Sequence, residues 1–168
     1  MRHAKAPTLA RGLTLIELVM TLAVLAILSA VALPSIGAGF ERHRLQASAQ
    51  ALSADIGEAR FEAARRGQAL HLQASAGADW CWSVSASPDC GCGRAQACQL
   101  QNVRAADHPG VQMISAQGLR LDGAGIAQAG TAALLQSPRG DRLRVDVSAL
   151  GRTRICAVSG SWPSLPTC

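Results

Sequence analysis

The sequence has no tyrosine, and aromatic residues make up only 3% of it. A surface that stacks nucleic-acid bases on aromatic rings is therefore not expected. Lysine is almost absent too, because Lys5 is the sole example. Basic surface elsewhere must then consist of arginine, whose planar fork of donors suits phosphate and carboxylate groups.

Catalytic patterns are also missing from the sequence. It has no glycine-rich phosphate loop, and His71 and His108 have no carboxylate or thiol neighbours in a recognisable arrangement. Because an enzyme needs several groups in complementary roles, we expect neither an enzyme nor a bound cofactor.

One long apolar run stands near the N-terminus. Residues 13–33 read LTLIELVMTLAVLAILSAVAL, with Glu17 as the single charge. A helix of about 20 apolar residues spans the hydrocarbon core of a bilayer. The basic residues that precede it are Arg2, Lys5 and Arg11, without an acid. This pattern predicts a transmembrane helix over 13–33, with the N-terminus in the cytoplasm and residues 34–168 outside.

Three kinds of N-terminal segment share this pattern. A secretory signal peptide has the same basic start, and the small residues 29–32 imitate its cleavage site. A plain single-span anchor is the second kind, and the precursor of a filament subunit is the third. Glu17 favours the third, because a carboxylate inside an apolar run costs free energy and usually marks function.

The stretch Gly12-Leu13-Thr14-Leu15-Ile16-Glu17 resembles the processing signal of type IV pilins and type II secretion pseudopilins. The resemblance implies that a prepilin peptidase removes residues 1–12 by cutting after Gly12 and then methylates the amine of Leu13. It also implies that Glu17 pairs with the N-terminal amine of a neighbouring pilin or pseudopilin in the filament. From the residues alone, Glu17 could instead reach the lipid headgroups, since it lies near the helix start.

Helical spacing resumes after Pro34, and the long helix should run over about 13–66 and end near Gly67, although a break is allowed near 34–39. One apolar stripe follows this second part: Leu45, Ala49, Leu52, Ile56, Ala59 and Ala63. Alternation then predicts strands over 69–73, 80–85, 111–115, 119–122, 132–136, 142–148 and 152–158, with loops over 86–98 and 104–110.

These elements predict an α+β, pilin-like fold, with the long helix packed on antiparallel sheet. Residues 54–72, ADIGEARFEAARRGQALHL, followed by Trp80, resemble the GspH/FimT branch of pilin-like proteins. The resemblance implies a minor pilin or a minor pseudopilin of the bacterial inner membrane, which later joins a pilus or a type II secretion pseudopilus.

Six cysteines all follow the apolar run: Cys81, Cys90, Cys92, Cys98, Cys156 and Cys168. An even number on one side of a membrane segment indicates an oxidising compartment and disulfides. The single residue between Cys90 and Cys92 is shorter than the usual spacing of zinc ligands, so we expect no metal site. Cys156 should pair with Cys168, whereas Cys90 and Cys92 each take either Cys81 or Cys98, and the sequence does not decide which.

Arginines gather on a predicted hairpin. Apolar residues alternate with Arg142, Arg144 and Asp146 on its first strand and with Arg152 and Arg154 on its second. A three-residue loop ending in Gly151 keeps both apolar faces on one side and sets Asp146 opposite Arg154. Arg142, Arg144 and Arg152 then lack an evident partner.

The arginine face allows two interpretations. Arg142, Arg144, Arg152 and Arg154 would suit the phosphates of double-stranded DNA, and residues 151–154, GRTR, resemble the GRxR motif of FimT-like minor pilins that bind DNA in natural transformation. Alternatively, the face is solvated or contacts a neighbouring pilin, and the chain has protein partners only. Arg60, on the helix, is expected to lie outside this surface.

Overall fold

The computed structural model describes residues 14–127 and 130–168, with side chains described outside residues 31–36. Gly12 and Leu13, at the predicted cleavage site, lie outside the described residues. The chain divides into two compact units, Met1–Ala38 and Gly39–Cys168. Within the described ranges, helix α1 (Leu15–Arg66) enters both units, and the strands belong to the second.

Helix α1 continues through residues 34–39, where the sequence allowed a break. Glycine weakens a helix by about 1 kcal/mol relative to alanine but leaves its backbone hydrogen bonds intact, so Gly37 and Gly39 are tolerated. Among the residues that the structure describes, no helix is both long and apolar enough to cross a membrane.

The C-terminal end of α1 lies where the sequence predicts it. Gly67 takes φ 63°, and the N–H of Gln68 donates to the carbonyl oxygen of Ala63 at 3.2 Å. This is the Schellman arrangement, in which a left-handed residue ends the helix.

Eight strands follow in the described part of the chain, and seven of them overlap the predicted ones. They are β1 (Leu70–Ser75), β2 (Cys81–Ser85), β3 (Gln99–Arg104), β4 (Gln112–Ala116), β5 (Leu119–Leu121), β6 (Gly130–Gln136), β7 (Arg142–Val147) and β8 (Thr153–Ser159). The prediction missed β3. Its two apolar residues, Leu100 and Val103, are three positions apart, so the strand lacks period-two alternation.

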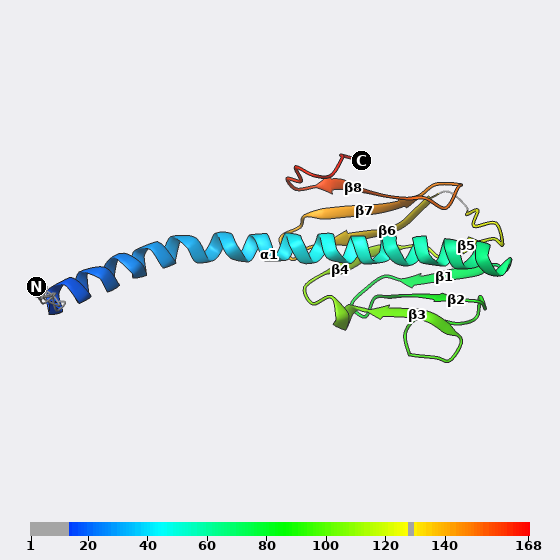
Figure 1. Ribbon diagram of the computed structural model, residues 1–168, viewed down its shortest axis with the longest axis horizontal. Helices are drawn as coiled ribbons and strands as arrows, with labels where there is room; N and C mark the ends of the chain where they lie inside the picture. The colour runs from blue at the N-terminus through cyan, green and yellow to red at the C-terminus, as the bar shows by residue number, and fades with distance from the viewer. Residues whose placement is uncertain (1–13, 128–129) are drawn as a thin grey trace, which may run out of the picture. The chain divides into compact units, whose positions relative to one another are not determined.

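The strands form two antiparallel sheets, with the orders β3-β2-β1-β5 and β4-β6-β7-β8. In the second unit, α1 lies across both sheets (Figure 1), since Asp55 contacts β2 and Ser53 contacts Thr153 of β8. The predicted stripe forms the helix side of the core, with every member at most 2% exposed. The predicted α+β arrangement of a helix on antiparallel sheet is confirmed.

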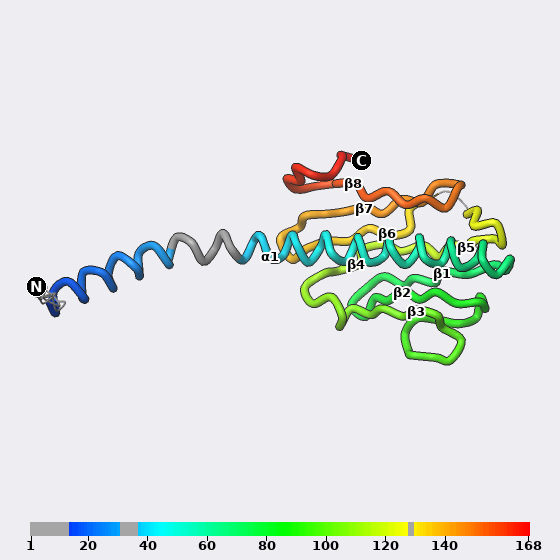
Figure 2. Tube along the Cα trace, viewed as in Figure 1, coloured from blue at the N-terminus to red at the C-terminus, as the bar shows by residue number. Residues whose placement is uncertain are grey.

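The outer edge of β8 is covered by the end of the chain. The N–H of Ala157 donates to the carbonyl oxygen of Pro166 at 2.8 Å. The N–H of Cys168 donates to the carbonyl oxygen of Ala157 at 3.0 Å. The C-terminal segment thus returns beside β8 (Figure 2). Because the outer edge of a sheet would otherwise expose unpaired backbone groups, this segment protects it.

Candidate functional site

The described N-terminal part of α1 is apolar on every side. Ten large apolar side chains between Leu15 and Leu28 are 52–82% exposed: Leu15, Ile16, Leu18, Val19, Met20, Leu22, Val24, Leu25, Ile27 and Leu28. A water-facing helix normally keeps a polar face, and contiguous apolar surface of this kind marks an interaction site. This segment is therefore built to be covered by something other than water.

The start of α1 is capped by Thr14, a contact that was not predicted from the sequence. Thr14 is the N-cap residue, because its hydroxyl oxygen accepts the backbone N–H of Glu17 at 3.3 Å. Threonine followed three residues later by glutamate is the pattern of a capping box, and a carboxylate in the first turn also favours the helix dipole. The pattern T-x-x-E in the sequence could have revealed this contribution.

The β7–β8 hairpin has the predicted turn and register. Asp146 lies opposite Arg154, and Gly151, which ends the three-residue loop, takes φ 68°. The N–H of Gly151 donates to the carbonyl oxygen of Ser148 at 2.8 Å. Leu143, Val145 and Val147 are buried on the inner face, so the arginines of β7 occupy the outer face.

The arginine pairing differs from the prediction. Arg144 has a partner, because its Nε donates to Asp146 Oδ2 at 3.0 Å. The other carboxylate oxygen of Asp146 accepts the hydroxyl of Thr131 at 2.8 Å. Arg142 also has a partner, since its Nε donates to Gln136 Oε1 at 2.7 Å. The Arg144–Asp146 pair lies within β7, two positions apart, whereas Thr131 and Gln136 belong to β6 and could not be identified from the hairpin alone.

Arg152 and Arg154 remain the open part of the surface. Both are exposed, and neither forms an ion pair with an acid in the described part of the chain. The position of Asp146 opposite Arg154 therefore does not produce a side-chain pair. Of the four predicted arginines, these two have the side chains most available to a ligand.

Arg60 lies at the hairpin tip, contrary to the expectation that it stands apart. A Cβ atom on Gly151 would lie 2.8 Å from Arg60 Cδ, and one on Gly125 would lie 2.9 Å from Arg60 Cγ. The aliphatic part of Arg60 thus passes between two glycines of different loops. The sequence shows no sign of this contact, because Gly125 and Gly151 become neighbours only in the folded chain.

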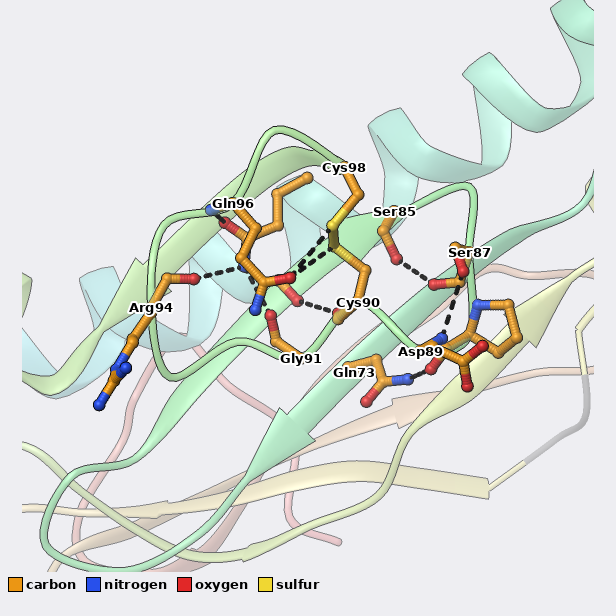
Figure 3. The surroundings of a disulfide bond; sticks show 12 residues. Gln73, Ser85, Ser87, Asp89, Cys90, Gly91, Arg94, Gln96 and Cys98 are labelled. Carbon is orange, nitrogen blue, oxygen red and sulfur yellow. Dashed lines mark hydrogen bonds between the residues drawn. A yellow bond between two sulfur atoms is a disulfide. The ribbon is translucent and has the colours of Figure 1, made fainter.

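All six cysteines, which lie within the described ranges, form disulfides. The pairs are Cys81–Cys92, Cys90–Cys98 and Cys156–Cys168. The predicted C-terminal pair is confirmed, and the structure decides the pairing that the sequence left open. In Figure 3 the Cys90–Cys98 bond closes a loop, and just before it Ser85 Oγ donates to the carbonyl oxygen of Ser87 at 2.7 Å.

This disulfide loop covers the outer face of β2. Ser83 and Ser85 are fully buried although they point away from α1. The hydroxyl of Ser83 donates to the carbonyl oxygen of Cys90 at 3.5 Å. The loop therefore acts as a third layer over the sheet.

His108 packs on two stacked tryptophans. The rings of Trp80 and Trp82 are 5.4 Å apart at 10°, and the His108 ring lies 5.9 and 5.7 Å from them. Burial lowers the pKa of His108 below its ordinary value, against the opposing charges of Asp107 and Asp55. His71 lies on β1, in register with Ser85 and Arg120, so the structure does not bring the two histidines together.

A helix packed across antiparallel sheets, with an apolar N-terminal part that carries one acid, defines a pilin-like protein. The family described as type II transport protein GspH matches residues 48–151, which run from within α1 to Gly151 in the β7–β8 turn. The chain belongs to the GspH family. No curated protein and no solved structure matches it.

Proposed function

We propose that the chain is a minor pilin or minor pseudopilin, a structural subunit of a type IV pilus or a type II secretion pseudopilus. The observation that carries the proposal is the apolar N-terminal part of α1, exposed on every side. In the precursor, residues 13–33 would anchor the chain in the inner membrane. In the filament, the same surface would pack against other pilin-like subunits.

Processing is the first test of this proposal. A prepilin peptidase should cut after Gly12 and methylate the amine of Leu13. Mass spectrometry of the membrane-extracted protein should then find a chain that begins at N-methylated Leu13. A chain that begins near Val31 would identify an ordinary signal peptide and overturn the proposal.

Glu17 should act in assembly through its charge. A carboxylate buried among packed helices needs a positive partner, and the amine of a neighbouring subunit would supply it. Glu17→Gln is the informative change, because glutamine also serves in a capping box and should leave the helix start intact. We expect normal cleavage and membrane extraction, with loss of the variant from isolated filaments.

Thr14→Ala is the matched control for Glu17→Gln. It removes the N-cap hydroxyl and leaves the carboxylate, and it should weaken the helix start by about 1 kcal/mol. If it blocks incorporation as strongly as Glu17→Gln, helix capping explains the effect and the charge has no separate role.

We also propose a second function, the binding of double-stranded DNA through the outer face of the β7–β8 hairpin. The supporting observation is that Arg152 and Arg154 are exposed and have no acidic partner among the described residues. Arginine contacts to phosphate are independent of sequence and weaken with salt. If this function is absent, the chain has protein partners only, as in a pseudopilus.

Replacing Arg152 and Arg154 together by Gln tests the second function. With the full chain in detergent micelles, affinity for labelled duplex DNA should fall for every sequence, and the log–log salt slope should shrink by about 0.9 for each lost contact. Arg94→Gln, in the exposed disulfide loop, is the control and should bind as the parent does. A parent that does not bind DNA at low salt would disprove this function.

A further inference from the structure

We infer that the cysteine cluster between β2 and β3 is a substrate site for a thiol–disulfide isomerase, which exchanges the partners of Cys90 and Cys92. The cluster consists of Cys81, Cys90, Cys92 and Cys98, which lie on β2 and on the loop that joins it to β3 (Figure 3). The inference concerns how the disulfides reach their final pairing, and it is independent of filament assembly and of DNA binding.

The two bonds of this cluster cross each other along the chain. Cys81 bonds Cys92, and the loop so closed contains Cys90. Cys90 bonds Cys98, and that loop contains Cys92. The other pairing that the sequence allows is uncrossed, with Cys90 bonded to Cys81 and Cys92 bonded to Cys98. Both of its loops are shorter than the native ones, so chain entropy slightly favours the uncrossed pairing.

Only the folded sheet distinguishes Cys90 from Cys92. A single glycine separates them, so in the unfolded chain their thiols are almost equivalent. The strand that fixes the end of the loop is β3, which pairs with β2. All four cysteines precede β3 in the sequence, and a chain is synthesised from its N-terminus. Oxidation can therefore take place before the sheet has selected the native pairing.

The folded protein favours the crossed pairing. Three of the four cysteines are buried, and only Cys98 is exposed. The loop is also fixed by hydrogen bonds, because Nε2 of Gln99 donates to the carbonyl oxygen of Gly91 at 2.6 Å. Exchanging the partners of Cys90 and Cys92 would shift this segment along the chain by two residues and disturb these contacts. The crossed pairing is thus the stable product, although chain closure alone does not select it.

A fully oxidised chain with the uncrossed pairing cannot correct itself. The remaining two cysteines, Cys156 and Cys168, are bonded to each other, so no free thiol is left in the chain. Because a disulfide is exchanged through attack by a thiolate, the thiolate must come from another molecule. This chemistry identifies the partner as an enzyme with a reduced cysteine in its active site.

Three exchanges complete the correction without net oxidation. The isomerase thiolate attacks Sγ of the exposed Cys98, forms a mixed disulfide and releases Cys92 as a thiolate. The Cys92 thiolate attacks Sγ of Cys81, which forms their native bond and releases Cys90 as a thiolate. The Cys90 thiolate then attacks Sγ of Cys98, which forms the second native bond and returns the isomerase thiolate.

Oxidative refolding of the full chain tests the inference. The reduced chain, unfolded in urea, is diluted into detergent micelles with diamide, an oxidant that removes two electrons and two protons for each disulfide. Trypsin cleavage after Arg94 separates Cys98 from the other three cysteines, and tandem mass spectrometry shows whether its partner is Cys90 or Cys92. About half of the chains should carry the uncrossed pairing, because the two pairings close loops of similar length.

After removal of diamide, a catalytic amount of reduced disulfide isomerase should convert the uncrossed chains to the native pairing. The same enzyme with serine in place of its active-site cysteine should leave them unchanged. If nearly every chain has the native pairing before the isomerase is added, the inference is overturned. Uncrossed pairing that persists with the active isomerase would overturn it as well.

The matched control combines Cys90→Ser with Cys98→Ser, which leaves a single possible bond in the cluster. This variant should form the Cys81–Cys92 bond to the same extent with and without the isomerase. Cys156→Ser with Cys168→Ser should keep the parent's dependence on the isomerase. The readout is bond connectivity, so it holds for a variant that is less stable than the parent. If the first variant responds to the isomerase as the parent does, exchange between Cys90 and Cys92 is not the catalysed step.

Discussion

The indole N–H of Trp82 donates a hydrogen bond to Oδ2 of Asp55 at 2.6 Å, and so ties the centre of β2 to the middle of α1. Trp82 is completely buried, and this carboxylate is the polar partner that its ring nitrogen needs. Burial raises the pKa of Asp55, and the charge of Glu58 adds to the rise, while the hydrogen bond from Trp82 and the charge of His108 oppose it.

Asp55 is predicted to stabilise the fold as a hydrogen-bond acceptor rather than as a charge. A raised pKa means that its contribution is present at low pH and is lost as pH rises through the folded-state pKa. Asp55→Asn keeps an acceptor without a charge, so the free energy of unfolding at neutral pH should stay within about 1 kcal/mol of the parent. Asp55→Leu leaves the Trp82 N–H unpaired and should cost about 1–3 kcal/mol.

Urea unfolding followed by tryptophan fluorescence would measure both Asp55 variants. Equal destabilisation by the asparagine and the leucine would contradict the prediction, because it would show that the charge itself is required.

His108 is predicted to make the fold sensitive to mild acid. Its pKa is lowered in the folded chain from the ordinary value of 6.5, so the unfolded chain binds the proton more readily. Stability should therefore be full above that value and should fall as pH drops from it toward the lower folded-state pKa. His108→Phe keeps a ring against Trp80 and Trp82 and removes the titration.

The comparison for His108 is the free energy of unfolding at about pH 8 and about pH 5. The parent should lose more stability over this interval than His108→Phe. An equal loss in the two proteins would assign the acid sensitivity to other groups.

Periodicity predicted the parts of the fold in which burial dominates. The stripe from Leu45 to Ala63 is buried as expected, and alternation located β7 because Leu143, Val145 and Val147 face the core. Periodicity did not predict β3, a polar edge strand whose position depends on backbone pairing with β2. Backbone pairing leaves no signature in the side chains of one strand.

The candidate site was predictable only within one hairpin. The register that sets Asp146 opposite Arg154 follows from the length of the loop. Thr131, which bonds Asp146, and Gln136, which bonds Arg142, both belong to β6. Arg60 belongs to the helix. These neighbours depend on how distant segments pack, which residue spacing does not encode.

The Cys156–Cys168 disulfide is predicted to hold the C-terminal segment against β8. It closes a loop with a sequence separation of 12, and the chain-entropy model assigns such a bond about 3 kcal/mol. Replacing both cysteines by Ser should lower the unfolding free energy by about that amount. Hydrogen exchange at the N–H of Ala157, which donates to Pro166, should also accelerate.

The matched control replaces Cys90 and Cys98, whose bond closes a loop with a similar separation of 8. This pair should also lower global stability, but it should not selectively expose the N–H of Ala157. The increase in exchange at the Ala157 N–H is to be compared after each variant's loss of global stability has been taken into account. If the corrected increase is the same in both variants, the C-terminal disulfide does not act locally on the edge of β8.

Gly151 is predicted to be required for packing as well as for backbone conformation, and Gly140 separates the two effects. Both have positive φ, 68° and 87°, so alanine at either position should cost about 1–2 kcal/mol of left-handed strain. A Cβ on Gly140 would meet nothing within 4 Å, whereas one on Gly151 would lie 2.5 Å from the Gly125 carbonyl oxygen. Gly151→Ala should therefore cost about 1–3 kcal/mol more than Gly140→Ala. Adding Arg60→Ala should recover little of this loss, because the contact with Gly125 is to rigid backbone and remains. Urea unfolding of the three variants measures the differences, and equal costs at positions 140 and 151 would show that the two tip loops do not pack as tightly as described.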